Sequence, residues 1–273
     1  MPEMPEVEQV RKTLAPHIIG KLIKKVEVRL PRLIQHPSAE VFADILVGQT
    51  IRDITRKGKY LTIEFYTNLR LVIHLRMTGS LIAVNEEMPE PDYAKVKFEL
   101  TGGENLWFCD IRTFGTLHLI INNDIEIEGY NTLGPEPLSD ELNTIYLAKA
   151  LEKRKAAIKG VILDQKIIAG LGNIYADEAL ATAKILPTRP ANSLSKNEIS
   201  HLVRGINAVI RQGIDNKGTT FRDYKDGEGN KGTNQEHLLV YGRGGKACKK
   251  CGTILSNIKV AGRGTTYCPK CQK

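Results

Sequence analysis

Four cysteines close to the end of the chain constrain its fold more than any other feature. Their spacing is Cys248-x2-Cys251-x16-Cys268-x2-Cys271. Paired Cys-x2-Cys motifs are typical of tetrahedral zinc sites, and four thiolates fill the coordination shell of the ion. Because no position is left for a substrate, the motif predicts one structural Zn2+ rather than a catalytic one. The segment between the pairs is long enough for a β-hairpin, with Arg263 between two glycines at its tip.

The formal net charge of +8 is concentrated in the same segment. From His237 to Lys273 the chain has eight Lys and Arg and no Asp or Glu. Subtracting these eight from the 39 basic residues leaves 31 in residues 1–236, which equals the 31 acidic residues there. A basic segment of this kind is typical of proteins that bind the phosphate backbone of nucleic acids. Arg263 is therefore a candidate phosphate ligand.

Composition favours a globular protein of the cytoplasm. The 273 residues, 41% of them hydrophobic, are enough for two domains with buried cores. No apolar run approaches the roughly 18–20 residues of a membrane span. The amino terminus also lacks the layout of a signal peptide. In the cytoplasm cysteines are expected as metal ligands or free thiols, and the fifth, Cys109, is expected to be a buried apolar residue.

The first half of the chain is predicted to form short antiparallel strands. Apolar and charged residues alternate strictly from Lys95 to Leu100, as in a strand with one buried face. Similar runs occur at Ile23–Leu30, Tyr60–Tyr66, Leu69–Arg76, Leu106–Cys109 and Thr116–Ile121. Many short strands at this spacing are typical of a sandwich or a barrel rather than of a doubly wound sheet.

The second half is predicted to be helical. After the Pro/Gly-rich segment 133–137, helical periodicity appears at Ser139–Lys155, Ala156–Gln165, Ile174–Lys184 and Ser195–Gln212. Ser139 and Ser195 are plausible helix starts, and only Ser195, with Glu198, has the spacing of a capping box. Residues 213–235 are rich in Gly, Asp, Asn and Lys, which predicts a long mobile loop.

Several local motifs allow two interpretations. Asn173, after Gly170-Leu171-Gly172, could cap a helix whose amides bind a phosphate, or could mark only a tight turn. Met77 and Phe114 lie next to arginines at predicted strand ends, where they could be wedges between bases or ordinary core residues. Lys59, at a turn, is by default a surface lysine.

The amino terminus combines residues typical of a helix start with a reactive group. Pro5 suits the first position of a helix, and an apolar stripe follows at Val7, Val10, Leu14 and Ile18. Neither feature explains Pro2-Glu3. If Met1 is removed, Pro2 becomes a secondary α-amine, a group whose pKa is about 8 and whose neutral form can attack an aldehyde-like carbon.

These motifs together resemble the formamidopyrimidine-DNA glycosylase family over the whole chain. In order they are Met-Pro-Glu-x-Pro-Glu-Val-Glu, Lys-Tyr-Leu, His-Leu-x-Met, Asp-x-Arg-x-Phe-Gly, Leu-Gly-Pro-Glu-Pro-Leu, Gly-Asn-Ile-Tyr and the four-cysteine ribbon. The resemblance implies an α+β fold with DNA in the cleft between two lobes. Residues 1–131 would form an antiparallel β-sandwich with flanking helices. Residues 132–236 would form a helix–two-turn–helix domain with a mobile loop at 217–235, and residues 237–273 a zinc-finger hairpin.

The resemblance also implies a bacterial repair enzyme, a monomer whose partner is damaged double-stranded DNA and whose one cofactor is zinc. It would excise oxidised purines and then nick the strand by β,δ-elimination. By the same resemblance Pro2 is the nucleophile, Glu3 the general acid/base, and Lys59 and Arg263 assist elimination. The implied DNA contacts are His74, Met77, Tyr93, Arg112, Phe114, Lys155 and Asn173.

Two departures and two alternatives accompany this hypothesis. Tyr93 stands where relatives often have histidine, and Thr78 stands where they often have glutamate. An endonuclease VIII-like glycosylase would share Pro2-Glu3 but act on oxidised pyrimidines; the Met77, Arg112 and Phe114 set and the long loop favour the purine enzyme. A zinc-ribbon DNA-binding protein without catalysis would explain the basic terminus but not Pro2-Glu3.

Overall fold

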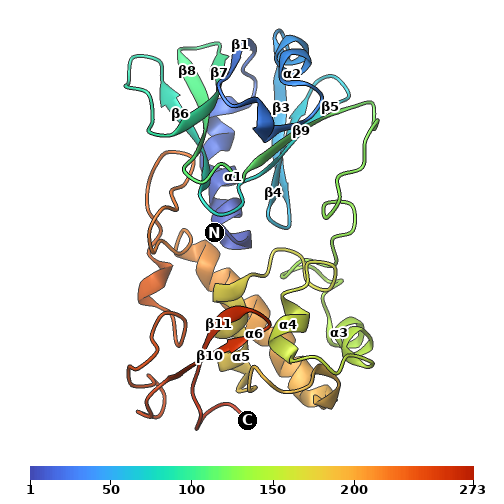
Figure 1. The fold of residues 1–273 in the computed structure, drawn as a ribbon, viewed down its shortest axis with the longest axis vertical. Helices are drawn as coiled ribbons and strands as arrows, with labels where there is room; N and C mark the ends of the chain where they lie inside the picture. The colour runs from blue at the N-terminus through green and yellow to red at the C-terminus, as the bar shows by residue number, and fades with distance from the viewer. The chain divides into compact units, whose positions relative to one another are not determined.

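The computed structural model describes residues 1–273, which form two compact units (Figure 1). The first unit consists of Met1–Asn131 together with Asn216–Thr233. The second consists of Thr132–Asp215 together with Asn234–Lys273. The loop assigned above to the helical domain is thus grouped with the sandwich in the structure. The division of the chain into three functional domains stays a prediction.

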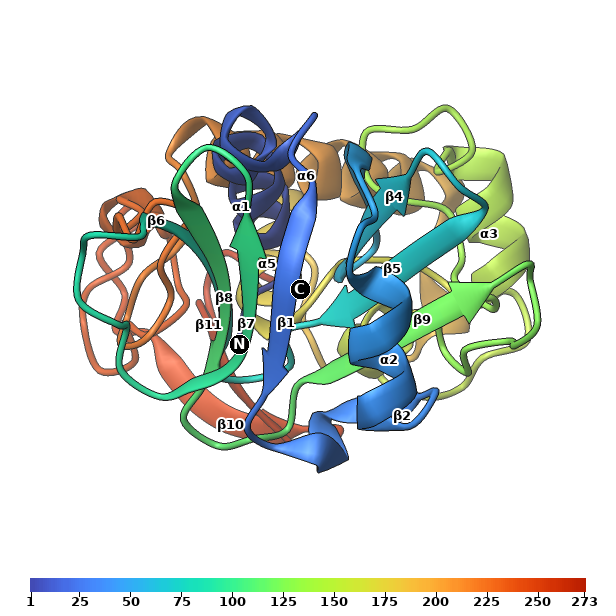
Figure 2. The same cartoon turned by 90° about the horizontal axis from the view of Figure 1, so that it is seen from above.

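Two sheets make up the first unit (Figure 2). One has the order β1-β7-β8-β6, with β1 at Ile23–Val28, β6 at Gly79–Asn85, β7 at Ala94–Leu100 and β8 at Glu104–Asp110. The other has the order β2-β9-β5-β4-β3, with β2 at Ile34–His36, β3 at Ile51–Lys57, β4 at Tyr60–Phe65, β5 at Leu69–His74 and β9 at Thr116–Ile121. All neighbours are antiparallel except the short β2, which runs parallel to β9. The predicted sandwich is confirmed, although β2, β3 and β6 were not among the predicted strands.

Helix α1, Met4–Ile18, fills the core of this unit. Its apolar stripe, Val7, Val10, Leu14 and Ile18, is fully buried. The helix contacts β3 and β4 of one sheet and β6 of the other, so one continuous core joins both sheets. Helix α2, Ala39–Leu46, packs against β1 and β2. The alternation from Lys95 to Leu100 is confirmed, because every apolar residue of β7 is buried and every charged one is half-buried.

The second unit is helical, with a carboxyl-terminal hairpin. Its helices are α3, Thr144–Leu151, α4, Ile158–Ile162, α5, Asn173–Ala183, and α6, Lys196–Asp215. Strands β10, Ser256–Val260, and β11, Arg263–Tyr267, form the hairpin. Helix α5 packs against both α6 and β11. The capping box at the start of α6 is confirmed, because the Ser195 amide donates to Glu198 Oε2 at 2.8 Å and the Glu198 amide donates to Ser195 Oγ at 3.3 Å.

The predicted start of α3 at Ser139 is wrong. Leu138 adopts a left-handed backbone with φ of 69°, and the Ser139 hydroxyl donates back to the Glu136 carbonyl at 2.9 Å. The hydroxyl therefore stabilises a turn rather than a helix start. Asn143 caps the helix instead, since its Oδ1 accepts from the Tyr146 amide at 2.9 Å. None of the helices has the length and apolar character needed to cross a membrane.

A buried ion pair attaches the hairpin to the helices of the second unit. Lys159 Nζ lies 2.6 Å from Asp177 Oδ1, and both side chains are fully buried. The same ammonium donates to the Gly264 carbonyl at 3.0 Å and to Thr265 Oγ1 at 2.7 Å. The second carboxylate oxygen of Asp177 accepts from the Thr266 amide at 3.0 Å. Strand β11 is thus held by charges on α4 and α5.

Removing one partner of this pair should be strongly destabilising, because the other charge would stay buried without its counterion. We expect Asp177→Ala to lower the free energy of unfolding of the second unit by about 3–5 kcal/mol. The double variant Lys159→Met, Asp177→Leu should lose less, because no buried charge remains. Urea unfolding of the zinc-loaded protein measures both. A loss for Asp177→Ala no larger than that of the double variant would contradict this account.

Candidate functional site

The start of α1 is built around the carboxylate of Glu6. Glu6 Oε2 accepts from the Glu3 amide at 2.9 Å, and Glu6 Oε1 accepts from the Thr219 amide at 2.7 Å. Glu3 has an extended backbone and is the N-cap, so the helix begins at Met4 and not at Pro5 as predicted. Pro2 and Glu3 are both buried. Glu6 therefore fixes the peptide segment that carries the candidate nucleophile and the candidate acid/base.

The segment Asn216–Thr233, called here the docked loop, lies against α1 and β6. The Tyr224 hydroxyl donates to the Glu6 carbonyl at 3.3 Å. The Gly227 amide donates to Thr13 Oγ1 at 2.8 Å, and the Gly227 carbonyl accepts from the Ala83 amide at 2.9 Å. These bonds give the docked loop a defined conformation beside the amino terminus. Its mobility stays a prediction.

A histidine links the docked loop to the sandwich. His17 Nδ1 lies 2.7 Å from Glu104 Oε1 on β8, and His17 Nε2 lies 3.2 Å from Glu228 Oε1 in the docked loop. Lys21 Nζ also faces Glu104, at 3.8 Å from Oε2. The hydrogen bond that Glu104 accepts from His17, followed by the one that Glu228 accepts, raises the pKa of His17 above its ordinary value. Nothing in the sequence around His17 indicated this contact, because both acidic partners are distant along the chain.

The raised pKa of His17 makes docking of the loop sensitive to pH. A raised folded-state pKa contributes stability that is complete below the unfolded value, about 6.5, and is lost as the pH rises through the folded value. We expect amide hydrogen exchange in residues 226–230 to become less protected between pH 6 and pH 8.5, after correction for intrinsic rates. His17→Gln should remove this pH dependence. The same pH dependence in the variant would exclude His17 as its cause.

Lys59 lies in the tight turn between β3 and β4. Lys57 pairs with Tyr60 in the sheet, which leaves Gly58 and Lys59 as the two turn residues. Arg56 joins this turn to α1, because its Nε lies 3.1 Å from Glu8 Oε2 and its Nη1 donates to the Gly58 carbonyl at 3.0 Å. Lys59 is largely buried rather than the freely exposed lysine expected by default.

His74 ends β5, directly opposite Tyr60 of β4. Burial, reinforced by the charges of Arg76 and Lys59, lowers the pKa of His74 to about 3, so the ring is neutral near pH 7. Its Nδ1 accepts from the Arg76 amide at 2.9 Å. The single ring proton is therefore on Nε2, which makes His74 an uncharged hydrogen-bond donor.

Two loops bring three predicted site residues together: Met77 from the loop between β5 and β6, and Arg112 and Phe114 from the loop between β8 and β9. Arg112 Nη1 donates to Met77 Sδ at 3.1 Å, and the Arg112 guanidinium lies over the Phe114 ring at 4.8 Å from its centroid. Met77 is 41% and Phe114 50% exposed, which excludes the interpretation that they are core residues. Tyr93 is also exposed, and its carbonyl accepts from the Asp110 amide, at the base of one of these loops, at 3.1 Å.

In the second unit, the Asn173 side chain binds the carboxyl-terminal hairpin at the residue next to Arg263. Gly172 has an extended backbone and is the N-cap of α5, so Asn173 is the first helical residue and not the predicted cap. Its Nδ2 donates to the Gly264 carbonyl at 3.0 Å, next to the exposed Arg263. Lys155 is exposed in the segment between α3 and α4.

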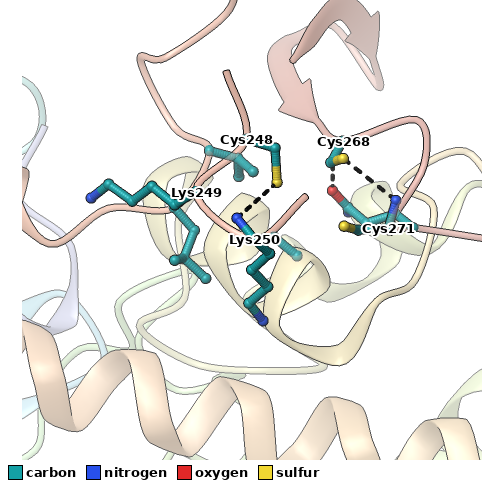
Figure 3. Close-up of a pocket in the computed structure, with 9 residues that line it drawn as sticks. Cys248, Lys249, Lys250, Cys268 and Cys271 are labelled. Atoms are coloured by element: carbon teal, nitrogen blue, oxygen red, sulfur yellow. Dashed lines mark hydrogen bonds between the residues drawn. The ribbon is translucent and has the colours of Figure 1, made fainter. Parts of the chain in front are cut away.

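The four motif cysteines converge as a metal site requires. Their sulfur atoms all lie within 4.8 Å of one another, and Cys251 Sγ and Cys268 Sγ are 3.5 Å apart. Zinc with four bonds of about 2.3 Å separates sulfurs by about 3.8 Å, so the set fits one tetrahedral ion. Backbone amides donate to the Cys248 and Cys268 sulfurs at 3.4 Å each (Figure 3). Such donors stabilise thiolates.

Glu178 connects this metal site to α5. The amides of three successive residues, Leu239, Val240 and Tyr241, donate to its carboxylate at 2.7–2.8 Å. Burial raises the pKa of Glu178, and these three bonds oppose the effect. No sequence motif predicted a role for Asp177 or Glu178. The available signal was an acidic pair within an otherwise apolar helix, since charges buried in such a helix are paired.

Comparison with known proteins decides the family. The model of the formamidopyrimidine-DNA glycosylase N-terminal domain matches residues 1–117, that of the family's H2TH domain matches 133–225, and a zinc finger found in FPG and IleRS matches 245–273. The chain belongs to the formamidopyrimidine-DNA glycosylase family. It is 48% identical to that glycosylase from Heliobacterium modesticaldum over all of both chains. It is 45% identical to the one from Desulforamulus reducens, over all of this chain and 99% of that one.

Solved structures of the family share the fold. The complex of a Lactococcus lactis FPG mutant with DNA that contains Fapy-dG superposes with a TM-score of 0.93, at 36% identity over all of both chains. The complex of Lactococcus lactis Fpg with DNA that contains an abasic site superposes with a TM-score of 0.92, at 36% identity over 99% of each chain. A complex of MutM with carbocyclic 8-oxo-G DNA gives a TM-score of 0.92, at 36% identity over all of both chains. The glycosylase family and its zinc finger establish the cysteine cluster as a structural zinc site.

Zinc content can be assigned to these cysteines by substitution. Cys109, the fifth cysteine, is buried beside Trp107, and burial raises the pKa of its thiol to about 12. We expect one zinc per chain in the wild type and in Cys109→Ser. Cys268→Ser should lose zinc and the exchange protection of β10 and β11, because zinc binding supplies the stability that a larger hydrophobic core would otherwise provide there. Atomic absorption and amide hydrogen exchange measure both. Full zinc content in Cys268→Ser would contradict the assignment.

Proposed function

We propose that this chain is a bifunctional DNA glycosylase and lyase that excises oxidised purines from double-stranded DNA. Its family membership supports DNA glycosylase activity, and related proteins have been solved with DNA that contains Fapy-dG, 8-oxo-G or an abasic site. The single observation that carries the proposal is the buried Pro2-Glu3 segment, held by Glu6 at the start of α1. The proposed location is the bacterial cytoplasm, at the nucleoid.

Pro2 is the proposed nucleophile. Its nitrogen becomes an amine only after removal of Met1, which is exposed. The amine attacks C1′ of the damaged nucleotide, and the bond from C1′ to the base breaks with its electron pair going to the base. The base leaves after taking up a proton in place of the one that the amine nitrogen loses. Glu3 supplies a proton to the sugar-ring oxygen as the ring opens, which yields an iminium between Pro2 and C1′. A first elimination removes a proton from C2′ and releases the 3′ phosphate, and a second removes a proton from C4′ and releases the 5′ phosphate.

The remaining candidate residues hold DNA in this proposal. Lys59 and Arg263 neutralise the phosphates that leave during elimination, because a fixed cation stabilises the charge that develops there. His74, Tyr93, Lys155 and Asn173 contact other phosphates, His74 as a neutral donor. Met77, Arg112 and Phe114 fill the space of the extruded nucleotide. Zinc holds the hairpin that carries Arg263 and takes no part in bond breaking.

Covalent trapping tests the nucleophile. Incubation with a duplex that contains 8-oxoguanine opposite cytosine, in the presence of borohydride, should give a protein–DNA adduct, since borohydride reduces the iminium to a stable amine. Pro2→Gly should lower the adduct yield to background, and Pro5→Ala, three positions further along and inside α1, should retain it. Preparations that keep Met1, identified by intact mass, should be inactive in proportion to their fraction.

Each alternative predicts a different trapping result. An endonuclease VIII-like enzyme would form more adduct with thymine glycol than with 8-oxoguanine. A zinc-ribbon DNA-binding protein would bind the duplex but form no adduct. An adduct that persists at equal yield in Pro2→Gly would overturn the assignment of Pro2.

A further inference from the structure

The two loops that carry Met77, Arg112 and Phe114 are hydrogen-bonded to one buried carboxylate, that of Asp110. Thr78, directly after Met77, donates its hydroxyl proton to Asp110 Oδ1 at 2.6 Å. The Arg112 amide is shared between Thr78 Oγ1 at 3.0 Å and Asp110 Oδ1 at 3.2 Å. A hydroxyl has one donor and can accept in addition, so both bonds of Thr78 form at once.

The second oxygen of Asp110 fixes the far end of the same loop. Asp110 Oδ2 accepts from the Gly115 amide at 2.8 Å. A Cβ at Gly115 would lie 2.4 Å from the Phe108 ring, so only glycine allows the backbone to approach this closely. Asp110 itself is 1% exposed, which shields these bonds from water. The loop from Arg112 to Phe114 is thus held at both ends.

The Thr78 side chain links the second loop to this frame beyond the last backbone pair of β6 and β8, Gly79 with Asp110. The contact between Arg112 and the Met77 thioether also crosses from loop to loop, but sulfur is a weak acceptor. The bond from the Thr78 hydroxyl to a buried carboxylate is charge-assisted and short, and is therefore the stronger connection. The ladder between β6 and β8 joins the bases of the two loops at Gly79 and Asp110. Without the hydroxyl, the parts of the loops beyond this pair would move more independently of each other.

We propose that Thr78 is a positioning residue that couples the two loops through Asp110, so that Met77, Arg112 and Phe114 enter DNA as one preformed wedge. The inference rests on the proposed function, in which these three side chains fill the space of the extruded nucleotide. A preformed wedge does not have to be ordered when the nucleotide leaves the stack. The coupling therefore speeds extrusion and has no part in the chemistry at C1′.

The test compares Thr78→Val, which removes the hydroxyl at constant shape, with Thr78→Ser, which keeps it. One substrate is a duplex with 8-oxoguanine opposite cytosine and 2-aminopurine next to the lesion, whose fluorescence reports unstacking. The other is single-stranded DNA with an abasic site, which leaves no space to fill. We expect Thr78→Val to slow unstacking and excision in the duplex about tenfold, the effect of one charge-assisted hydrogen bond. Cleavage of the single strand should be unchanged, and Thr78→Ser should behave as the wild type.

The outcomes separate the inference from the function on which it rests. If the wild type fails to excise 8-oxoguanine, the proposed function is wrong. If the wild type excises it and Thr78→Val does so equally fast, only the coupling is wrong. If Thr78→Val slows both substrates alike, Thr78 merely supports the fold, and the coupling is again overturned.

Discussion

One carboxylate, that of Glu6, joins the start of α1 to a residue 213 positions further along the chain. One oxygen holds the amide of Glu3, and the other holds the amide of Thr219 in the docked loop. Both donors are buried, and each would cost about 1–3 kcal/mol if left without an acceptor. The position of the amino terminus and the position of the docked loop are therefore set by the same group. Both sheets of the sandwich pack against α1, which carries Glu6, and so fix its position.

The carboxyl-terminal hairpin depends on buried charge where the first unit depends on apolar packing. The apolar cluster at the carboxyl terminus is small and consists largely of metal-site cysteines with Ala181, Val240 and Leu255. So small a core cannot hold a hairpin by itself. Lys159, Asp177 and Glu178 supply the missing attachment, because each makes hydrogen bonds to the backbone of the hairpin or of the segment before it. Zinc and buried ions together thus keep Arg263 in a fixed place.

What the sequence predicted correctly is local, and what it missed is distant along the chain. Cysteine spacing, the alternation in β7 and the Ser195 capping box each involve residues within one or two turns or strands. The prediction that Asn173 caps α5 is wrong because Gly172 is the N-cap. The Asn173 side-chain amide instead donates to the carbonyl of Gly264, 91 residues away. His17, Glu6 and Asp110 gain their roles from partners in other elements. No local pattern distinguishes such polar residues from solvent-exposed ones. The family, in contrast, was predicted correctly from the order of the motifs along the chain.

The burial of Pro2 and Glu3 next to an exposed Met1 bears on the proposed role of Pro2 as a nucleophile that is inactive until Met1 is removed. Met1 is 49% exposed, whereas Pro2 is buried and Glu3 is only 2% exposed. An aminopeptidase therefore meets an accessible residue whose removal disturbs no buried contact of Glu3. In the proposed mechanism, the amine that results belongs to the residue whose peptide bond to Glu3 is already held by Glu6. The same hydrogen bond that supports the start of α1 thus fixes the position of the proposed nucleophile, Pro2.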